Sequence, residues 1–310
     1  ATALASAALL IVALAAFGGA TTAGLAARYA ATDLALPDRR ARDLSVVVWA
    51  TTIGSVAGPN LAEPAGRLTE LFGGPGDAGP YLLSAVAFGA AALVVWAGLR
   101  PDPLVLARGA VASLARTDLA AAWASLRASG PARLALGGIV LSHLVMVGLM
   151  SMTPVHMDHG GASLRVVGIV ISLHIAGMFA LSPLIGWVAD HAGRVPVLAA
   201  GALLLVAAGA VSASAPSTGA VQLSVGLTLL GAGWSCALVA GSALLTESVP
   251  VAVRPDVQGL SDLAMNSGGA LGGVLAGATV ALASYSVLAL ATVVLVAPFL
   301  VVAVARVRTA

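Results

Sequence analysis

The chain has 310 residues, of which 59% are hydrophobic and only 9% are charged. Its mean hydropathy of +1.02 excludes an ordinary soluble domain, because so few charges cannot cover a water-facing surface. The net charge of +2 comes from 15 arginines without any lysine and does not indicate binding to nucleic acid. A single cysteine, Cys236, excludes a disulfide framework and a Cys-x-x-Cys metal site. We therefore expect an all-α, multi-pass membrane protein.

Nine apolar stretches come close to the roughly 20 residues that a bilayer-spanning helix requires. The predicted spans are residues 5–32, 44–62, 80–98, 134–154, 165–187, 195–213, 219–244, 257–283 and 285–305. The segment from 99 to 133 mixes arginines with apolar residues such as Leu104, Trp123 and Leu126, as an amphipathic helix on the membrane surface would. The expected domains are a partial helical bundle (1–98), a cytoplasmic linker (99–133) and a six-helix bundle (134–310).

The arginines predict the orientation, because short cytoplasmic loops retain positive charge. With the nine spans above, twelve arginines fall on one side of the membrane, and only Arg67 and Arg165 lie in loops on the other. The C-terminus is therefore predicted to be cytoplasmic. The twelve are Arg39, Arg40, Arg42, Arg100, Arg108, Arg116, Arg127, Arg133, Arg194, Arg254, Arg306 and Arg308.

One polar loop carries a recognisable motif. Gly186, Asp190, Gly193 and Arg194 are spaced as in the GxxxDxxGR loop of the major facilitator superfamily, which this chain resembles. The resemblance implies two helical bundles that alternate access to a central site. It also implies a gate in which Asp190 caps or pairs across a helix end and Arg194 holds the cytoplasmic side closed. A simple helix–helix turn is the alternative.

Two glycine-rich segments extend the resemblance. Gly54, Gly58 and Pro59 form a GxxxGP pattern similar to that of the superfamily's fifth helix, where small residues pack closely and proline weakens the helix. Residues 268–277, with five glycines, stand in the place of the eleventh helix. The resemblance then implies that residues 5–32 form the fourth of twelve helices. We accordingly expect helices one to three of the fold to be missing from a chain that begins at Ala1.

Histidine and methionine are concentrated in one region. Nine of the eleven His and Met residues lie between His143 and Met178. Met146 and Met150 form an MxxxM pair in one span, and His174 and Met178 form an HxxxM pair in the next. A spacing of four places both members of a pair on one helix face. At about 1.5 Å per residue, Met146 and His174 lie at matching depths.

These residue types favour copper, since thioethers are soft ligands that select Cu(I) and imidazole also accepts it. His143 lies close to the same stripe as Met146 and Met150. The residues Met152, His156, Met157 and His159 are predicted to lie in a loop outside the membrane that collects the ion. Methionine is also a common hydrophobic filler, and an intramembrane histidine can serve a structural hydrogen bond.

The MxxxM and HxxxM motifs resemble those of the CcoA-type copper importers of the superfamily. This resemblance implies copper as the transported substrate, the bacterial inner membrane as the location, and ligand roles for Met146, Met150, His174 and Met178. The expected partners are the copper ion, the lipid bilayer and a cytoplasmic copper chaperone. We expect a monomer without cofactor and without nucleic acid.

Four polar residues near helix ends are candidates for coupling transport to an ion gradient: Asp262 with Asn266, and Arg28 with Asp33. Capping or packing of helix ends is the alternative. Three other functions remain open: a carrier of a small organic solute such as a vitamin or drug, a copper-binding membrane protein that does not transport, and, least favoured, an enzyme. The sequence contains neither an HExxH helix nor a GxSxG elbow.

Overall fold

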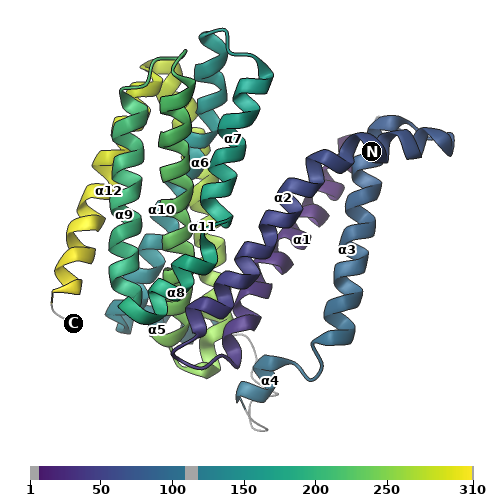
Figure 1. The fold of residues 1–310 in the computed structure, drawn as a ribbon. Helices are drawn as coiled ribbons and strands as arrows, with labels where there is room; N and C mark the ends of the chain where they lie inside the picture. Colours follow the sequence, from purple (N-terminus) through teal and green to yellow (C-terminus); the bar gives the residue numbers. More distant parts are fainter. Residues whose placement is uncertain (1–6, 109–117, 309–310) are drawn as a thin grey trace.

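The computed structural model describes residues 7–108 and 118–308, which are helical without any strand. Figure 1 shows the twelve α-helices of these residues. Seven helical segments within them, in α3 and from α6 to α12, have the length and hydropathy to cross a membrane. The helices are α1 (Ala7–Asp33), α2 (Arg40–Leu71), α3 (Gly79–Gly98), α4 (Pro103–Arg108), α5 (Leu119–Ala128), α6 (Gly130–His159), α7 (Leu164–Phe179), α8 (Ser182–Ala192), α9 (Arg194–Ala213), α10 (Ala220–Glu247), α11 (Arg254–Leu282) and α12 (Tyr285–Val307), with short 3₁₀ turns at Gly76–Ala78 and Val251–Val253.

Helices α6 to α12 form a tightly packed bundle with α10 at its centre. Helix α10 packs against α6, α7 and α9, while α11 packs on α6 and α12 on α9. Small residues make these close crossings feasible. A Cβ atom on Gly201 of α9, for example, would lie only 3.0 Å from the carbonyl oxygen of Gly233 in α10. Because lipid does not drive apolar helices together, such close van der Waals packing is what holds this bundle.

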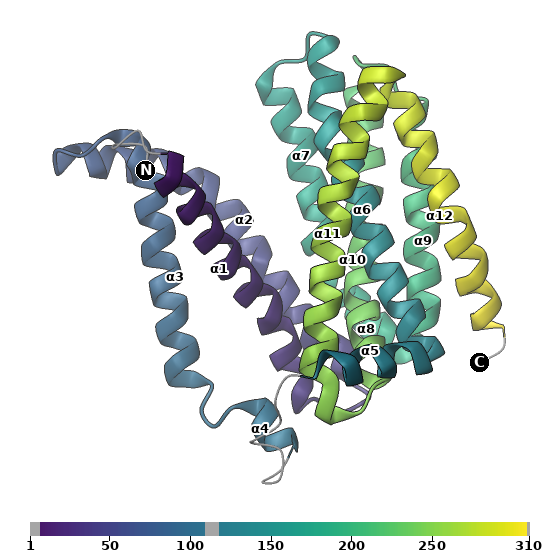
Figure 2. The same ribbon diagram turned by 180° about the vertical axis from the view of Figure 1, so that it is seen from behind.

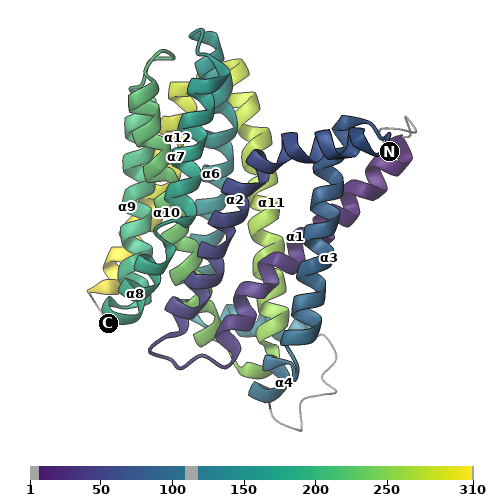
Figure 3. The same ribbon diagram turned by 45° about the vertical axis from the view of Figure 1, so that its right-hand side comes forward.

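Helices α1 and α2 lean on this bundle at one end only (Figures 1, 2 and 3). We call this the arginine-rich end, since Arg40, Arg194 and Arg254 begin helices there. Helix α2 crosses α8 at Gly186, where a Cβ atom would lie 2.7 Å from the carbonyl oxygen of Ala41. Toward the opposite end, α1 and α2 diverge from the bundle, and α3 stands beyond them. The two parts of the protein are therefore closed against each other at the arginine-rich end and splayed at the other.

The observed helices depart from the predicted spans in three places, one of which is α2, where the helix continues to Leu71 and does not end at residue 62. The span predicted at 165–187 is broken into α7 and α8, because Pro183 lacks the N–H that would continue the helix from α7. Helix α6 continues to His159 with Pro154 inside it, so Met152, His156, Met157 and His159 lie on helical turns and not in the predicted loop. Met157 is also fully buried, which is incompatible with collecting an ion from solvent in this state.

The predicted linker is not one continuous amphipathic helix. It contains α4 and α5, while residues 109–117, including Arg116, lie outside the described part of the chain. Helix α5 lies across the arginine-rich end of the bundle (Figure 2), burying Leu126 and exposing Trp123. Arg127 stacks over the Trp123 ring at 5.1 Å, so this helix is amphipathic as predicted but short.

The prediction of close packing at Gly54 and Gly58 is not met within the described residues. No atom of a neighbouring segment lies within 4 Å of a Cβ atom built at either glycine. The reason is that α2 diverges from the bundle beyond its crossing with α8 (Figure 1). Helix α2 continues without a break past Pro59 to Leu71.

Candidate functional site

The GxxxDxxGR loop lies at the arginine-rich end, between α8 and α9. Gly193 has φ = 97°, a conformation that residues with a Cβ rarely adopt, and it turns the chain directly into α9. Asp190, on the last turns of α8, accepts hydrogen bonds from the backbone amides of Ala41 (3.1 Å) and Arg42 (2.8 Å) at the start of α2. A carboxylate at a helix N-terminus satisfies amides that have no partner within the helix. The bundle is thereby fastened to α2.

Arg194 extends this contact into a network of ion pairs. Its guanidinium lies 2.9 Å from the Asp190 carboxylate and 2.9 Å from that of Glu247 at the end of α10. It also donates to the carbonyl oxygen of Pro37, in the turn between α1 and α2, at 2.6 Å. Arg40 approaches Glu247 to 3.6 Å. We refer to Asp190, Arg194, Glu247 and the first turn of α2 as the gate network.

A second charged contact joins α1 to α11. Arg28 and Asp262 form a buried ion pair, and Arg28 also donates to the Tyr29 hydroxyl at 3.2 Å. The Arg28 and Asp262 side chains are only 3% and 10% exposed. The coupling candidates Arg28 and Asp262 are therefore brought into direct contact. Because burial of both charges is costly unless each is paired, the position of α1 is tied to this contact.

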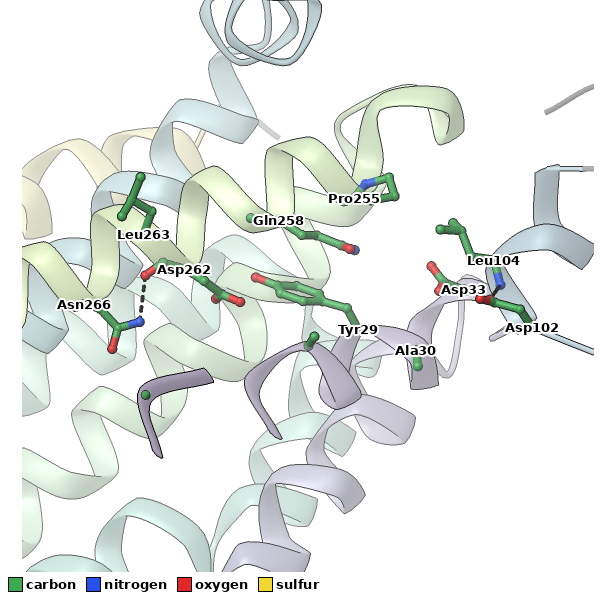
Figure 4. Close-up of a pocket in the computed structure, with 13 residues that line it drawn as sticks. Tyr29, Ala30, Asp33, Asp102, Leu104, Pro255, Gln258, Asp262, Leu263 and Asn266 are labelled. Atoms are coloured by element: carbon green, nitrogen blue, oxygen red, sulfur yellow. Dashed lines mark hydrogen bonds between the residues drawn. The ribbon is translucent and has the colours of Figure 1, made fainter. Parts of the chain in front are cut away.

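A cavity of about 780 Å³ opens beside this pair, between α1, α11 and α4. Figure 4 shows the Tyr29 hydroxyl pointing toward the Asp262 carboxylate, with the Gln258 side chain above the Tyr29 ring and with Asp33 and Asp102 at the other side. Asn266 donates to the Asp262 carbonyl oxygen at 2.8 Å, one turn away on α11. All four coupling candidates thus lie at or beside one cavity.

The HxxxM pair faces α10. His174 has no exposed surface, and its Nδ1 lies 2.7 Å from the carbonyl oxygen of Leu227. A carbonyl only accepts, so Nδ1 carries the hydrogen and Nε2 presents a lone pair. Within the described residues, this buried Nε2 has no hydrogen-bond partner. Met178 lies one turn further along α7, at the close crossing with Gly231 of α10.

The MxxxM pair lies on α6, which packs against α10. His143 of α6 accepts a hydrogen bond at Nδ1 from the indole N–H of Trp234 at 2.9 Å, which fixes the register of α6 against α10. Helices α6 and α10 run in opposite directions, so Met146 and Met150 reach the level of Gly231 and Leu227. Met146 is buried. Both motifs therefore lie at the level of the same turn of α10, residues 227–231, which His174 and Met178 contact directly.

Among the accessory candidates at the far end of α6, His156 contacts Tyr285 and Ala215. His156 stacks on the Tyr285 ring, with centroids 4.2 Å apart, and its Nε2 lies 3.3 Å from the Ala215 carbonyl oxygen. Within residues 7–108 and 118–308, no three His, Cys, Asp or Glu side chains are grouped to hold a metal ion. Any site in the bundle would therefore depend on methionine.

The close crossing of α7 and α10 gives a testable prediction. A Cβ atom on Gly231 would lie 2.9 Å from the backbone nitrogen of Met178, so Gly231→Ala must push these helices apart. We expect a loss of roughly 1–3 kcal/mol, seen as a lower midpoint of thermal unfolding in detergent. Gly273→Ala on α11 is the control, because its Cβ meets nothing closer than 3.8 Å. Equal midpoints for the two variants would contradict the prediction.

Sequence reasoning missed several partners in these sites, among them Trp234, Glu247 and the Leu227 carbonyl. A tryptophan in a span rich in small residues is a usable signal, because its N–H requires a partner inside lipid. A backbone carbonyl carries no such signal.

Helices α1–α3 and the α6–α12 bundle are held together by charged contacts at one end only. This is the arrangement of a two-bundle membrane carrier. Residues 135–310 match the Major Facilitator Superfamily, and the chain belongs to this superfamily of membrane transporters, which confirms the superfamily that the sequence motifs predicted. It is 39% identical to the MFS-type transporter YddS of Bacillus subtilis, over 94% of this chain and 67% of YddS. It is also 39% identical to YdeG of the same organism, over 91% of this chain and 66% of YdeG. The riboflavin transporter RfnT of Brucella anthropi is 26% identical, over 80% and 61% of the two chains. The chain thus spans about two thirds of the length of these relatives.

Proposed function

We propose that this protein carries copper into the cytoplasm across the bacterial inner membrane by alternating access. The ligands are Met146 and Met150 of α6 together with His174 and Met178 of α7. The observation that carries the proposal is the state of His174. Its Nδ1 is held by a backbone carbonyl while its buried Nε2 has no partner.

This arrangement is the one that a metal-binding histidine needs. Such a histidine usually donates its other ring N–H to a carbonyl or carboxylate, which fixes the tautomer and the orientation of the lone pair. A buried acceptor without a partner is costly, so a structure that retains one calls for an explanation. Binding of a metal ion to Nε2 supplies it.

Methionine completes the ligand set in the same layer of the bundle. Met178 lies one turn from His174, and Met146 and Met150 of α6 lie at the level of the same turn of α10. Thioethers and one imidazole favour Cu(I) over harder divalent ions. Two pairs on separate helices also suit transport, because a small movement of α7 relative to α6 weakens the site and releases the ion.

The conformation supports a carrier rather than a static copper-binding protein. The gate network closes the arginine-rich end, while α1 and α2 diverge from the α6–α12 bundle at the other end (Figure 1). Since arginine favours the cytoplasmic side, this state is open toward the outside. A protein that only stored copper would not need a gate that can break and reform.

Copper accumulation tests the proposal. Copper-limited cells producing the full-length protein should accumulate copper, and His174→Ala should reduce uptake by roughly tenfold or more, since loss of metal-site partners costs 10–100-fold. Met265→Ala is a matched control, because Met265 is a buried methionine on α11 outside both motifs. Equal uptake by wild type and His174→Ala at equal membrane abundance would exclude a copper route through α7.

An organic solute is the second candidate, and the cavity beside Tyr29 favours it. Its volume of about 780 Å³ exceeds what a bare ion requires, and its lining combines an aromatic ring with amide and carboxylate groups. The relative RfnT is named a riboflavin transporter. Uptake of labelled riboflavin that is unaffected by copper and lost in Tyr29→Ala would favour this candidate.

A further inference from the structure

A groove on the outside of the bundle is not used by the transport path. It lies between α6 and α12 at the arginine-rich end and has a volume of about 370 Å³. Leu134, Gly137, Phe299 and Val302 form its apolar part, and Arg133 and Arg306 line it as well. Helix α12 packs on α6 and α9 and presents Val302, which is 50% exposed, on its other face. This surface faces the lipid.

The two arginines stand where the helices reach the membrane surface. Arg306 lies in the last turn of α12, and its guanidinium nitrogens are 3.7 Å from a Cβ atom built at Gly130. Arg133 donates to the carbonyl oxygen of Arg127 in α5. Within the described residues, no carboxylate pairs with Arg133. Two guanidinium groups, those of Arg133 and Arg306, therefore line the groove at the arginine-rich end.

The arginine-rich end of the groove also has the features of a membrane interface. Helix α5 lies across the end of the bundle, and its Trp123 is 48% exposed beneath the Arg127 guanidinium. Tryptophan and arginine at a helix end are typical of the headgroup level. From that level, the apolar groove runs along α6 and α12 into the hydrocarbon layer.

We propose that this groove binds an anionic phospholipid. The headgroup phosphate lies between Arg133 and Arg306, and one acyl chain lies over Gly137 against the Phe299 ring. Two arginines can neutralise a phosphate, and Arg guanidinium groups match its oxygens in geometry. An unoccupied glycine surface beside an aromatic ring accommodates a chain that a larger residue would displace. A zwitterionic lipid fits the same groove with less electrostatic gain.

The test compares two lipids on the purified full-length protein in a neutral detergent. Phosphatidylglycerol and phosphatidylcholine with identical acyl chains are titrated, and bound lipid is measured by native mass spectrometry together with the thermal unfolding midpoint. Each arginine near an anionic headgroup contributes roughly a fivefold gain in affinity. We therefore expect phosphatidylglycerol to bind about twentyfold more tightly, and high salt to reduce that preference.

Variants separate the groove from general surface charge. Arg133→Gln with Arg306→Gln should abolish the preference for phosphatidylglycerol, whereas Arg308→Gln, two residues further along and outside the groove, should retain it. Gly137→Leu should weaken binding of both lipids without unfolding α6, since its Cβ meets nothing closer than 3.9 Å. If the double variant does not fold, Gly137→Leu decides the question alone. Equal binding of the two lipids to wild type, or unchanged binding by Gly137→Leu, would overturn the proposal.

Discussion

Replacing Asp190 with alanine is expected to open the arginine-rich end of the protein and to abolish transport. The substitution removes hydrogen bonds to the amides of Ala41 and Arg42 and the ion pair with Arg194. Charge-assisted hydrogen bonds contribute about 1.5–3 kcal/mol each, so two of them shift the closed–open equilibrium by roughly a hundredfold or more. Because the carboxylate joins two parts of the fold, its loss affects their association more than the folding of either part.

Labelling of an introduced cysteine measures this opening directly. Ser45 is fully buried at the crossing of α2 and α8, so Ser45→Cys, in a Cys236→Ala background, reacts with a maleimide only when the crossing separates. We expect Asp190→Ala to accelerate this labelling by at least about tenfold. Asp38→Ala is the control, because it removes an exposed carboxylate from the neighbouring turn. Similar labelling rates in the two variants would show that Asp190 does not hold the gate.

The sequence predicts most of this gate but not its partners. The spacing of Gly186, Asp190, Gly193 and Arg194 indicates the loop, because a tight turn needs glycine and a helix end favours charge. The acceptor groups in contact with it are backbone amides of α2 and the Glu247 carboxylate, 53 residues from Arg194. Amides have no sequence signature, and a distant contact depends on how α2 leans on α8.

The bounds of the helices likewise depend partly on local sequence and partly on tertiary packing. Apolar length predicts α9 and α12 to within two residues, since hydropathy in lipid decides where a span begins and ends. The break between α7 and α8 depends on Pro183, and the extension of α6 to His159 depends on packing around Tyr285 and Ala215. Packing also explains why Gly54 and Gly58 lack a close partner in the described residues. A GxxxG pattern makes a close crossing feasible, but the tilt of the whole helix decides whether it occurs.

The ion pair between Arg28 and Asp262 should have the largest effect on stability. Asp262→Leu leaves a buried guanidinium without its carboxylate, and breaking such a pair typically costs about 3–5 kcal/mol. Removing both charges is different, since a buried pair can often be replaced by apolar residues at little cost. We therefore expect Arg28→Met with Asp262→Leu to unfold close to the wild-type temperature, whereas either single variant unfolds well below it.

The double variant also separates gating from folding. If the pair holds α1 against α11, the stable double variant should still label faster at Ser45→Cys, because the apolar replacement restores packing but not the directed contact. Glu63→Ala is the control for a lost carboxylate, since its pair with Arg67 is 75% exposed on both sides and contributes little. A double variant as unstable as the single ones would mean that the charges act through other partners. If the double variant is stable and is labelled at Ser45→Cys as slowly as the wild type, the Arg28–Asp262 pair contributes to folding only. The gate network by itself would then close the arginine-rich end.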